Sequence, residues 1–359
     1  MQTFKVNAGS SSYKVIIGEG AWSALRDFPL KRYTSIFVIT EKKLWTLWGK
    51  RLVQEGRLSR ARTLFVPAGE TSKSLPALER LAGRLLKLGA DRRSLLVLFG
   101  GGVIGDLGGF LASVYMRGID YVNVPTTVLA QVDSSIGGKT AVNLSEMKNL
   151  IGTFYPPKLV LSDPRVLASL SKRDFRSGLY EVVKHAILDG QDFFSQLEHC
   201  AVSLRPDDAS AIESILPRAA KVKIDVVNRD EREAGLRMVL NLGHTFGHAL
   251  EEATHYERFV HGEAVAWGLL AISRLGQRLG VLGASEGERM ESLVWKFGSL
   301  PKIRDLSPAK ILRLLPQDKK TVGGKIYWVV PEKIGKIRFI ANAPASSVAA
   351  AFQDIQRMN

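Results

Sequence analysis

Residues 94–106 read SLLVLFGGGVIGD, a short apolar run that passes directly into a cluster of glycines. The run 94–99 is rich in Leu, Val and Phe and is followed by Gly, which is typical of a buried strand. Gly100, Gly102 and Gly105 then match the spacing G-x-G-x-x-G, in which glycines allow a close backbone approach to a diphosphate and a helix N-terminus supplies N–H donors. The match indicates either a nucleotide-binding turn or a plain strand-to-helix turn, because this strand is the third in the chain and not the first.

The sequence on both sides of this stretch alternates between two patterns. Further short apolar runs at 35–40, 62–66, 121–124 and 158–161 predict strands, and helical spacing at 41–56 and 74–89 lies between them. This alternation is typical of a parallel sheet with helices on its faces. We therefore predict an α/β N-terminal domain over residues 1–163, with a parallel sheet and a nucleotide site.

The second half of the chain has a different pattern. Long helical patterns predominate after Asp163, and two late apolar runs, 325–330 and 336–340, predict a small hairpin. We predict a mainly α-helical C-terminal domain over residues 164–359, which carries the metal site. The helical patterns cover 171–189, 208–229, 244–256, 262–280 and 285–298.

Composition restricts the class of protein. The chain has 359 residues, 45% of them hydrophobic, which excludes wholesale disorder. Cys200 is the single cysteine, so an intrachain disulfide and a cysteine-rich metal site are excluded. No apolar stretch approaches the roughly 18 residues of a membrane span. We expect a protein of a reducing compartment, the cytoplasm, with no membrane partner.

The net charge of +15 comes from 50 basic and 35 acidic residues. The basic residues are spread along the chain with acidic ones between them, and no Lys/Arg run of the kind that forms a nucleic-acid arm appears. A solvated basic surface accounts for most of the excess, and the remainder favours a small anionic substrate over nucleic acid.

Two other strand ends support the nucleotide interpretation. Thr126 and Thr127 close the strand after the glycine loop, and Glu70 and Lys73 close an earlier one. Because the carboxyl ends of parallel strands share one edge of a sheet, and ligands bind at that edge, these side chains are candidates for cofactor contacts.

Histidine spacing predicts a metal site. His244 and His248 lie at i and i+4 and so share one helix face, His261 opens the next helical pattern, and Glu181 lies on an earlier one. Two His and one Glu form a three-ligand set with an open position, as catalytic divalent ions require. A lone helix histidine is more often packed or solvated, and we interpret His199 and His255 in that way. Most of Glu251, Glu252 and Glu257 are interpreted as solvated helix charges.

Several cations accompany these motifs. Cations near a metal site are costly unless an anion is present. As a set they are therefore candidates for holding carboxylate and phosphate groups, although any one of them alone is better explained as a solvated surface charge. The set is Arg117, Lys139, Lys148, Lys184, Lys223 and Arg237.

Together the motifs resemble 3-dehydroquinate synthase, a family of the sugar-phosphate cyclase superfamily that acts in the shikimate pathway of aromatic amino acid biosynthesis. The resemblance extends from about residue 35 to 340, with the motifs in the family's order. It rests on GGGVIGD ending at Asp106, PTT ending at Thr127, QVDSSIGGKT ending at Thr140, NLGHTFGH ending at His248 and HGE ending at Glu263.

The resemblance implies a reaction and its cofactors. The substrate is 3-deoxy-D-arabino-heptulosonate 7-phosphate, and the products are 3-dehydroquinate and phosphate. The reaction comprises transient oxidation by NAD+, phosphate elimination, re-reduction and intramolecular aldol closure. It classes the enzyme as a carbon–oxygen lyase and requires NAD+ and a divalent metal, Zn2+ or Co2+.

The resemblance also implies the roles of individual residues. The metal ligands are Glu181, His244 and His261. The catalytic residues are Lys139, Lys184, Lys223, Arg237, Asn241 and His248. The substrate-binding residues are Arg117, Asp133, Lys148, Asn149 and Lys320. The cofactor-binding residues are Glu70, Lys73, Gly101, Gly102, Val103, Gly105, Asp106, Thr126, Thr127, Lys139, Lys148 and Ser169. Arg117 resembles an arginine that reaches the neighbouring subunit's site, which implies a homodimer.

Three alternatives remain at this point. The first is another sugar-phosphate cyclase, which keeps the metal and NAD motifs but changes substrate residues. The second is a metal-dependent NAD polyol dehydrogenase, which would release NADH. The third is a basic binding protein on a decayed enzyme fold, against which the intact Glu/His/His set argues. The chain also departs from the family pattern at Glu41, in the loop 142–147 and at Ser169.

Overall fold

A computed structural model of the chain describes all residues except 10, 145–146, 234, 316–325 and 359. The chain divides into two compact units, Met1–Ser171 with Arg205–Arg232, and Lys172–Leu204 with Glu233–Asn359. This grouping differs from a single division at residue 163, because α8 (Leu216–Arg229) packs against β1 (Gln2–Ala8) and η6 (Ala130–Ser134) of the first unit.

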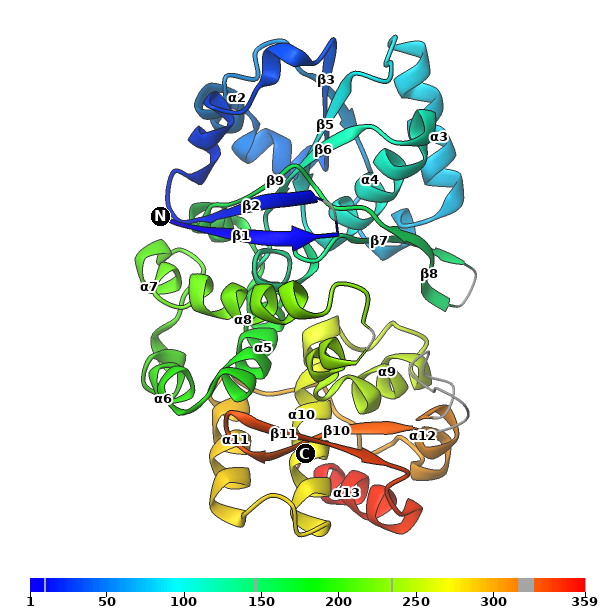
Figure 1. The fold of residues 1–359 in the computed structure, drawn as a ribbon. Helices are drawn as coiled ribbons and strands as arrows, with labels where there is room; N and C mark the ends of the chain where they lie inside the picture. Colours follow the sequence, from blue (N-terminus) through cyan, green and yellow to red (C-terminus); the bar gives the residue numbers. More distant parts are fainter. Residues whose placement is uncertain (10, 145–146, 234, 316–325, 359) are drawn as a thin grey trace. The chain divides into compact units, whose positions relative to one another are not determined.

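The first unit is built on a seven-stranded sheet with the order β1-β2-β9-β6-β5-β3-β4 (Figure 1). The pairs from β2 to β4 along this order are parallel, and only the edge pair β1–β2 is antiparallel. The strands are β1 (Gln2–Ala8), β2 (Ser11–Ile17), β3 (Ser35–Thr40), β4 (Arg62–Phe65), β5 (Ser94–Gly100), β6 (Asp120–Pro125) and β9 (Leu159–Ser162).

Residues 94–106 form the centre of this unit. β5 is buried along its whole length, and Gly101 caps α4 (Gly102–Val114), which packs on β5 and β6. A Cβ atom on Gly108 would lie 2.4 Å from Leu98 Cδ2, so glycine allows the helix to lie close against the sheet. The predicted α/β architecture with a parallel sheet is confirmed.

The helices and remaining strands of the first unit agree only in part with the sequence pattern. The predicted helix at 74–89 is α3 (Leu75–Lys87), whereas 41–56 is divided among several short pieces. The pattern did not predict the antiparallel hairpin β7 (Lys139–Leu144) and β8 (Met147–Phe154), which forms a sheet of its own. The other helical elements are α1 (Lys42–Leu44), η3 (Trp45–Gly49), α2 (Lys50–Gly56), η1 (Ala21–Arg26), η2 (Leu30–Arg32), η4 (Glu70–Ser72), η5 (Tyr115–Arg117), η6 (Ala130–Ser134), η7 (Pro164–Ser169) and α7 (Ala209–Glu213).

The second unit is mainly helical, as predicted. Its central element is α10 (His261–Arg278), which is buried over most of its length. It packs against α5 (Lys172–Asp189), α9 (His244–Ala253), α11 (Ala284–Lys296) and α13 (Ala345–Arg357). The hairpin of β10 (Tyr327–Lys333) and β11 (Lys336–Ala341) also contacts α10, through β10 (Figure 1). The remaining elements are α5 (Lys172–Asp189), α6 (Gln191–Cys200), η8 (Ala201–Ser203), η9 (Leu236–Asn241), α9 (His244–Ala253), α11 (Ala284–Lys296), α12 (Pro308–Leu314) and α13 (Ala345–Arg357). Over the described part of the chain, every helix is too short or too polar to cross a membrane.

Candidate functional site

Three helices of the second unit bring the predicted metal ligands together. Glu181 lies within α5, whereas His244 and His261 are the first residues of α9 and α10. The Nε2 atoms of His244 and His261 lie 3.5 and 3.4 Å from Glu181 Oε1, and one ligand atom of each residue lies within 4.8 Å of the others. The three donors therefore converge on one point.

Close backbone contacts hold these helices at short distances. A Cβ atom on Gly262 would lie 1.8 Å from the Ser177 carbonyl oxygen of α5, and the Gly262 N–H donates to Ser177 Oγ at 3.0 Å. A Cβ atom on Gly268 would lie 1.8 Å from the carbonyl oxygen of Gly243, which caps α9. Glycines at these crossings allow α10 to lie against both helices that carry the other ligands.

The trio contains a buried carboxylate that is paired with a buried lysine. The Glu181 side chain is fully buried, and the Lys184 ammonium, also buried, contacts its Oε2 atom. Burial lowers the pKa of His261, but hydrogen bonds to the carboxylates of Glu181 and Glu251 outweigh that effect and raise it to about 10.

Two imidazoles and one carboxylate form a donor set that suits a divalent cation such as Zn2+ or Co2+. Each residue offers one ligand atom, and three protein ligands leave further coordination positions for a substrate. The residues present thus fit a catalytic divalent metal.

Glu251 corrects one interpretation made from the sequence. The sequence assigns most of Glu251, Glu252 and Glu257 to solvated helix charge, but only 2% of Glu251 is exposed, and its Oε2 atom lies 3.4 Å from His261 Nδ1. A signal was present, because Glu251 lies seven residues after His244 and therefore on the same helix face as His244 and His248.

The other predicted residues of the second unit are His248, Asn241, Arg237 and Lys320, and of these His248 lies next to the ligand histidines. The His248 ring lies 5.5 Å from that of His244 and 6.3 Å from that of His261, measured between centroids. Asn241 Nδ2 donates to Glu233 Oε1 at 3.2 Å, and Arg237 is almost fully buried. Lys320 lies outside the described residues.

The predicted cofactor residues of the first unit form a polar cluster beside the glycine loop. The Lys73 ammonium lies 2.6 Å from Asp106 Oδ2 and 3.7 Å from Glu70 Oε1, and Asn143 Nδ2 donates to Glu70 at 2.9 Å. Glu70 and Lys73 lie in η4 and directly after it, Asp106 lies in α4 and Asn143 in β7, so the tertiary fold joins parts of the chain that are more than 70 residues apart.

The glycine loop has little free space for larger residues. A Cβ atom on Gly101 would lie 3.0 Å from Thr127 Cγ2, and one on Gly102 would lie 3.3 Å from Ser134 Oγ. Thr126 pairs with the loop through its N–H, which donates to the Gly100 carbonyl at 3.0 Å. The loop therefore presents bare backbone at the start of a 13-residue helix, which suits a phosphate-bearing cofactor.

Two hydroxyls among the predicted cofactor residues make local contacts. Thr127 Oγ1 accepts a hydrogen bond from the Ala130 N–H at 3.1 Å. Ser169 Oγ donates to the Val166 carbonyl at 2.8 Å. Gly105 lies inside α4, where a Cβ atom would meet Asn123 Nδ2 at 3.2 Å, and Val103 lies in the first turn of the same helix.

The predicted substrate residues of the first unit fall into separate groups. Lys223 Nζ lies 3.0 Å from Asp133 Oδ1 and donates to the Asp133 carbonyl at 2.7 Å. Lys139, Lys148 and Asn149 all lie on the β7–β8 hairpin, where the Lys139 ammonium is 6.0 Å from the centre of the Phe154 ring.

Arg117 ends η5 and is exposed. Both Arg117 and the preceding Met116 have positive φ angles, 69° and 49°. Two consecutive residues other than glycine in this region are uncommon, and such local strain is often found where a side chain must be held in position.

Comparison with known proteins identifies the family. Residues 63–177 match the family model described as 3-dehydroquinate synthase N-terminal, and residues 178–321 match the one described as 3-dehydroquinate synthase C-terminal. The chain belongs to the 3-dehydroquinate synthase family. The chain is 40% identical to a 3-dehydroquinate synthase of Dictyoglomus thermophilum, and the alignment covers 98% of each chain.

Solved structures of sugar-phosphate cyclases share the fold of this 3-dehydroquinate synthase family member. ValA, a 2-epi-5-epi-valiolone synthase from Streptomyces hygroscopicus with NAD+ and Zn2+ bound, superimposes with a TM-score of 0.88 at 26% identity over 99% of this chain and 100% of ValA. A 2-deoxy-scyllo-inosose synthase complexed with carbaglucose-6-phosphate, NAD+ and Co2+ gives 0.87 at 25% identity over 98% of this chain and 99% of that one.

Proposed function

We infer that this chain catalyses the conversion of 3-deoxy-D-arabino-heptulosonate 7-phosphate to 3-dehydroquinate and phosphate. The observation that carries the inference is the agreement between family membership over nearly the whole chain and the convergence of Glu181, His244 and His261. A sequence similarity of 40% to a 3-dehydroquinate synthase, against 25–26% to two other cyclases, favours this activity over that of another sugar-phosphate cyclase.

NAD+ and a divalent metal, zinc or cobalt, are the proposed cofactors. Two structures of similar fold contain NAD+ with Zn2+ or Co2+, which supports this assignment. When bound, NAD+ accepts and returns a hydride, and the metal acts as a Lewis acid toward substrate oxygens. The Glu181, His244 and His261 trio would hold the metal, and the glycine loop with Lys73 and Asp106 would hold NAD+.

The chain's own residues supply charge and position in this scheme. Lys184, beside the Glu181 carboxylate, and the buried Arg237 place positive charge in the second unit, where it would stabilise developing negative charge on the substrate. His248 is close enough to the ligand histidines to orient water or relay a proton. In the first unit, Lys223 and Asp133 are proposed to bind substrate, together with Lys139, Lys148 and Asn149.

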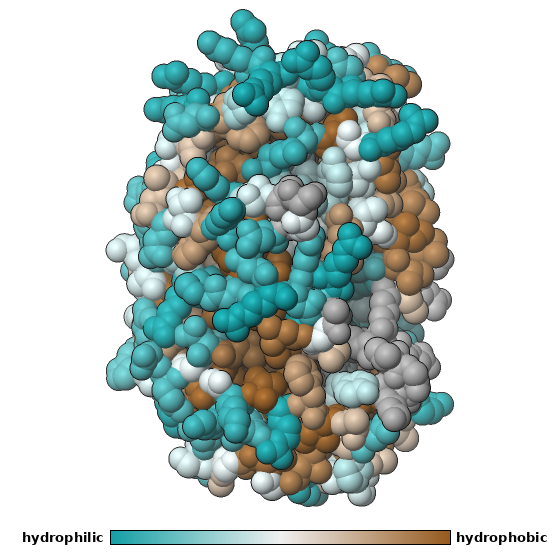
Figure 2. All heavy atoms as spheres, in the orientation of Figure 1, coloured by the Kyte–Doolittle hydropathy of each residue, from teal (hydrophilic) through white to brown (hydrophobic). Residues whose placement is uncertain are grey.

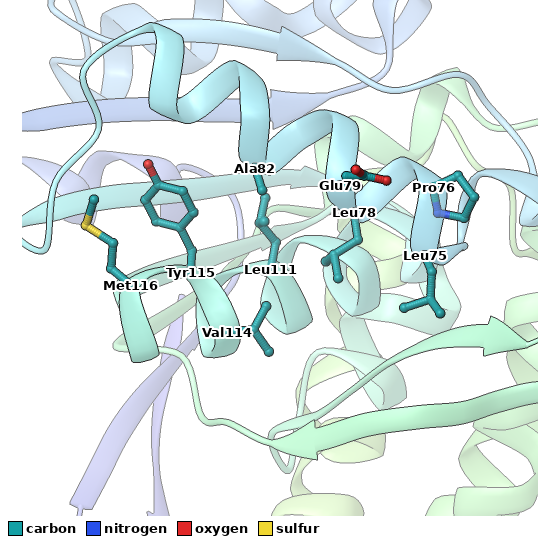
Figure 3. Close-up of a pocket in the computed structure, with 9 residues that line it drawn as sticks. All are labelled: Leu75, Pro76, Leu78, Glu79, Ala82, Leu111, Val114, Tyr115 and Met116. Carbon is teal, nitrogen blue, oxygen red and sulfur yellow. The ribbon is translucent and has the colours of Figure 1, made fainter.

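A homodimer is the proposed assembly, with Arg117 reaching the partner's site. Its support is an apolar surface beside Arg117, here called the α3–α4 face, which lines a cavity of about 500 Å³ (Figure 3). Leu75, Val114 and Met116 on this face are 38%, 45% and 37% exposed. Figure 2 shows a hydrophobic area on the side where Figure 1 places α3 and the β7–β8 hairpin. An exposed apolar patch of this kind is typical of an interface, and a second copy is the commonest partner.

The deciding assay follows phosphate release and 3-dehydroquinate formation after the heptulosonate phosphate is added with NAD+ and Co2+. We expect both products in equal amounts with no accumulation of NADH, and we expect no turnover by the His244→Ala variant. Accumulating NADH would support the polyol dehydrogenase. Phosphate release from a hexose 6-phosphate, with none from the heptulosonate phosphate, would support another cyclase. Absence of turnover with every substrate would support the third alternative, a basic binding protein on a decayed enzyme fold. We propose the cytoplasm as the location of the protein.

A further inference from the structure

The residue Glu251 makes a contact that the roles assigned above do not include. It lies near the end of α9, is 98% buried, and directs Oε2 toward Nδ1 of His261 at 3.4 Å. The opposite ring nitrogen of His261, Nε2, is the one that faces Glu181. We propose that Glu251 is a positioning residue that holds the His261 ring in the orientation that presents Nε2 to the metal. The proposal rests on the metal-dependent function inferred above.

The second ligand histidine is held in a parallel way. His244 Nδ1 lies 3.2 Å from the Leu242 carbonyl oxygen, and its Nε2 atom faces the same Glu181 oxygen. Each imidazole thus has an oxygen acceptor at Nδ1 and the converging point at Nε2. A histidine ligand generally donates its second N–H to a carboxylate or carbonyl, which fixes the tautomer and the ring orientation.

The orientation of the His261 ring depends more on an acceptor at Nδ1 than that of the His244 ring does. His261 is the first residue of its helix, and 31% of its side chain is exposed, whereas 12% of the His244 side chain is exposed. Rotation about the Cβ–ring bond has only a broad, weak preference, so packing on one side does not fix a partly exposed ring. A buried carboxylate on the neighbouring helix supplies the missing restraint.

The backbone around Glu251 is itself well ordered by local hydrogen bonds. Its carbonyl accepts from the N–H groups of Tyr256 and Thr254 at 2.8 and 3.3 Å, in the turn that ends α9. His255 and Tyr256 in this turn have positive φ angles of 52° and 60°. The carboxylate is therefore carried by a fixed segment that leads from α9 toward the start of α10.

The test measures Co2+ binding by the full chain in the absence of substrate, with Glu251→Ala and Glu251→Gln. Loss of a carboxylate behind a metal-ligating histidine typically weakens metal binding about 10- to 100-fold. We expect a loss of that size for Glu251→Ala and a smaller one for Glu251→Gln, whose amide oxygen can still accept from Nδ1. In the Zn2+-loaded protein, the Nδ1 proton resonance of His261 should move in both variants while that of His244 stays in place.

Glu291→Gln is the matched control. Glu291 is also a buried carboxylate of the second unit, paired with Arg274 at 2.6 Å, so its replacement removes a buried charge at a different place. Unchanged Co2+ affinity and an unchanged His261 resonance in folded Glu251→Ala would overturn the proposal, and so would an equal loss of affinity in Glu291→Gln. Failure of the wild-type protein to turn over the heptulosonate phosphate, with Co2+ bound normally, would instead count against the proposed function alone.

Discussion

At the residue scale, Lys184 and Glu181 form a buried ion pair. Both side chains are at least 99% out of solvent, and removal of one member of a buried ion pair typically costs about 3–5 kcal/mol. We expect Lys184→Met to lower the free energy of unfolding of the metal-free protein by an amount of that order. Because a divalent cation would replace the lost positive charge, Co2+ should stabilise this variant more than it stabilises the wild type.

Urea unfolding of both proteins, with Co2+ and after chelation, measures this difference. Lys310→Met is a suitable control, since the Lys310 ammonium donates to a backbone carbonyl, that of Ala253, at 2.8 Å. Equal stabilisation of the wild type and Lys184→Met by Co2+ would show that the metal does not bind beside Glu181.

At the element scale, the crossing of α5 and α10 depends on the absence of a side chain at Gly262. An added methyl would meet the Ser177 carbonyl at 1.8 Å, and backbone cannot yield as a flexible side chain can. We expect Gly262→Ala to lower the free energy of unfolding by more than about 3 kcal/mol, the upper end of the usual range for overpacking, if the helices cannot move. If they do move, His261 moves away from Glu181, and Co2+ affinity falls.

Gly283→Ala provides the comparison for this variant. Gly283 caps α11, and nothing lies within 4 Å of the position that its Cβ would occupy. Loss of a glycine cap should cost less than about 1 kcal/mol. Thermal unfolding and Co2+ titration of both variants test the expectation, and wild-type behaviour of Gly262→Ala in both measurements would contradict it.

A second prediction at this scale concerns how α2 is tied to η7. Glu55 on α2 receives hydrogen bonds from Arg51 at 2.8 Å and from Arg165 of η7 at 2.9 Å. Burial raises the pKa of Glu55, but these hydrogen bonds outweigh burial and hold it below its usual value. A depressed carboxyl pKa contributes stability that is present above the unfolded-state pKa and is lost as the pH falls through the folded one.

We therefore expect Glu55→Gln to lower the free energy of unfolding by about 1 kcal/mol at pH 7. The difference from wild type should shrink as the pH falls below about 4, close to the ordinary pKa of Glu. Urea unfolding at pH 7, 5 and 3.5 measures this trend, with Glu257→Gln, at an exposed position, as a control. A difference that stays constant across these pH values would rule out the electrostatic explanation.

At the scale of the whole molecule, the α3–α4 face should mediate self-association. Val114, 45% exposed on this face, would place an unpaired charge in the proposed interface if changed to Glu. We expect Val114→Glu to convert dimers to monomers in light scattering, because desolvation of the charge disfavours burial. Leu47→Glu, at a 57% exposed position of the same unit, should leave the dimer intact. A monomeric wild type, or a dimeric Val114→Glu protein, would contradict the proposed interface.

The proposed role of Arg117 across that interface has a separate test. Arg117→Ala and His261→Ala are each expected to be inactive. If Arg117 acts on the partner's site, a mixed dimer has one site with both changes and one with neither, so activity should reappear when the two proteins exchange subunits. Demonstrated exchange without recovered activity would mean that Arg117 acts within its own subunit.

Local sequence pattern was sufficient for most of the architecture. The runs 35–40, 62–66, 94–99, 121–124 and 158–161 became five parallel strands of the central sheet. The inner strands among them show continuous apolar runs because both of their faces are buried, whereas 62–66 forms the partly exposed edge strand β4. The long amphipathic patterns after residue 170 became helices for a similar reason, since one face of each must be covered. The identities of the three converging ligands also followed from spacing and family resemblance, although their metal-binding role is still a prediction.

Only the tertiary structure decided which contacts join distant segments. The edge pair β1–β2 and the β7–β8 hairpin expose much of their surface, so their sequences lack an uninterrupted apolar signal, and their pairing depends on partners elsewhere. The packing of 205–232 with the first unit likewise depends on the partner that α8 meets. Glu251 shows the same limit at one residue. Helical spacing places its carboxylate on the face of His244, but whether that face meets water or the ring of His261 depends on where α10 begins, which no local pattern contains.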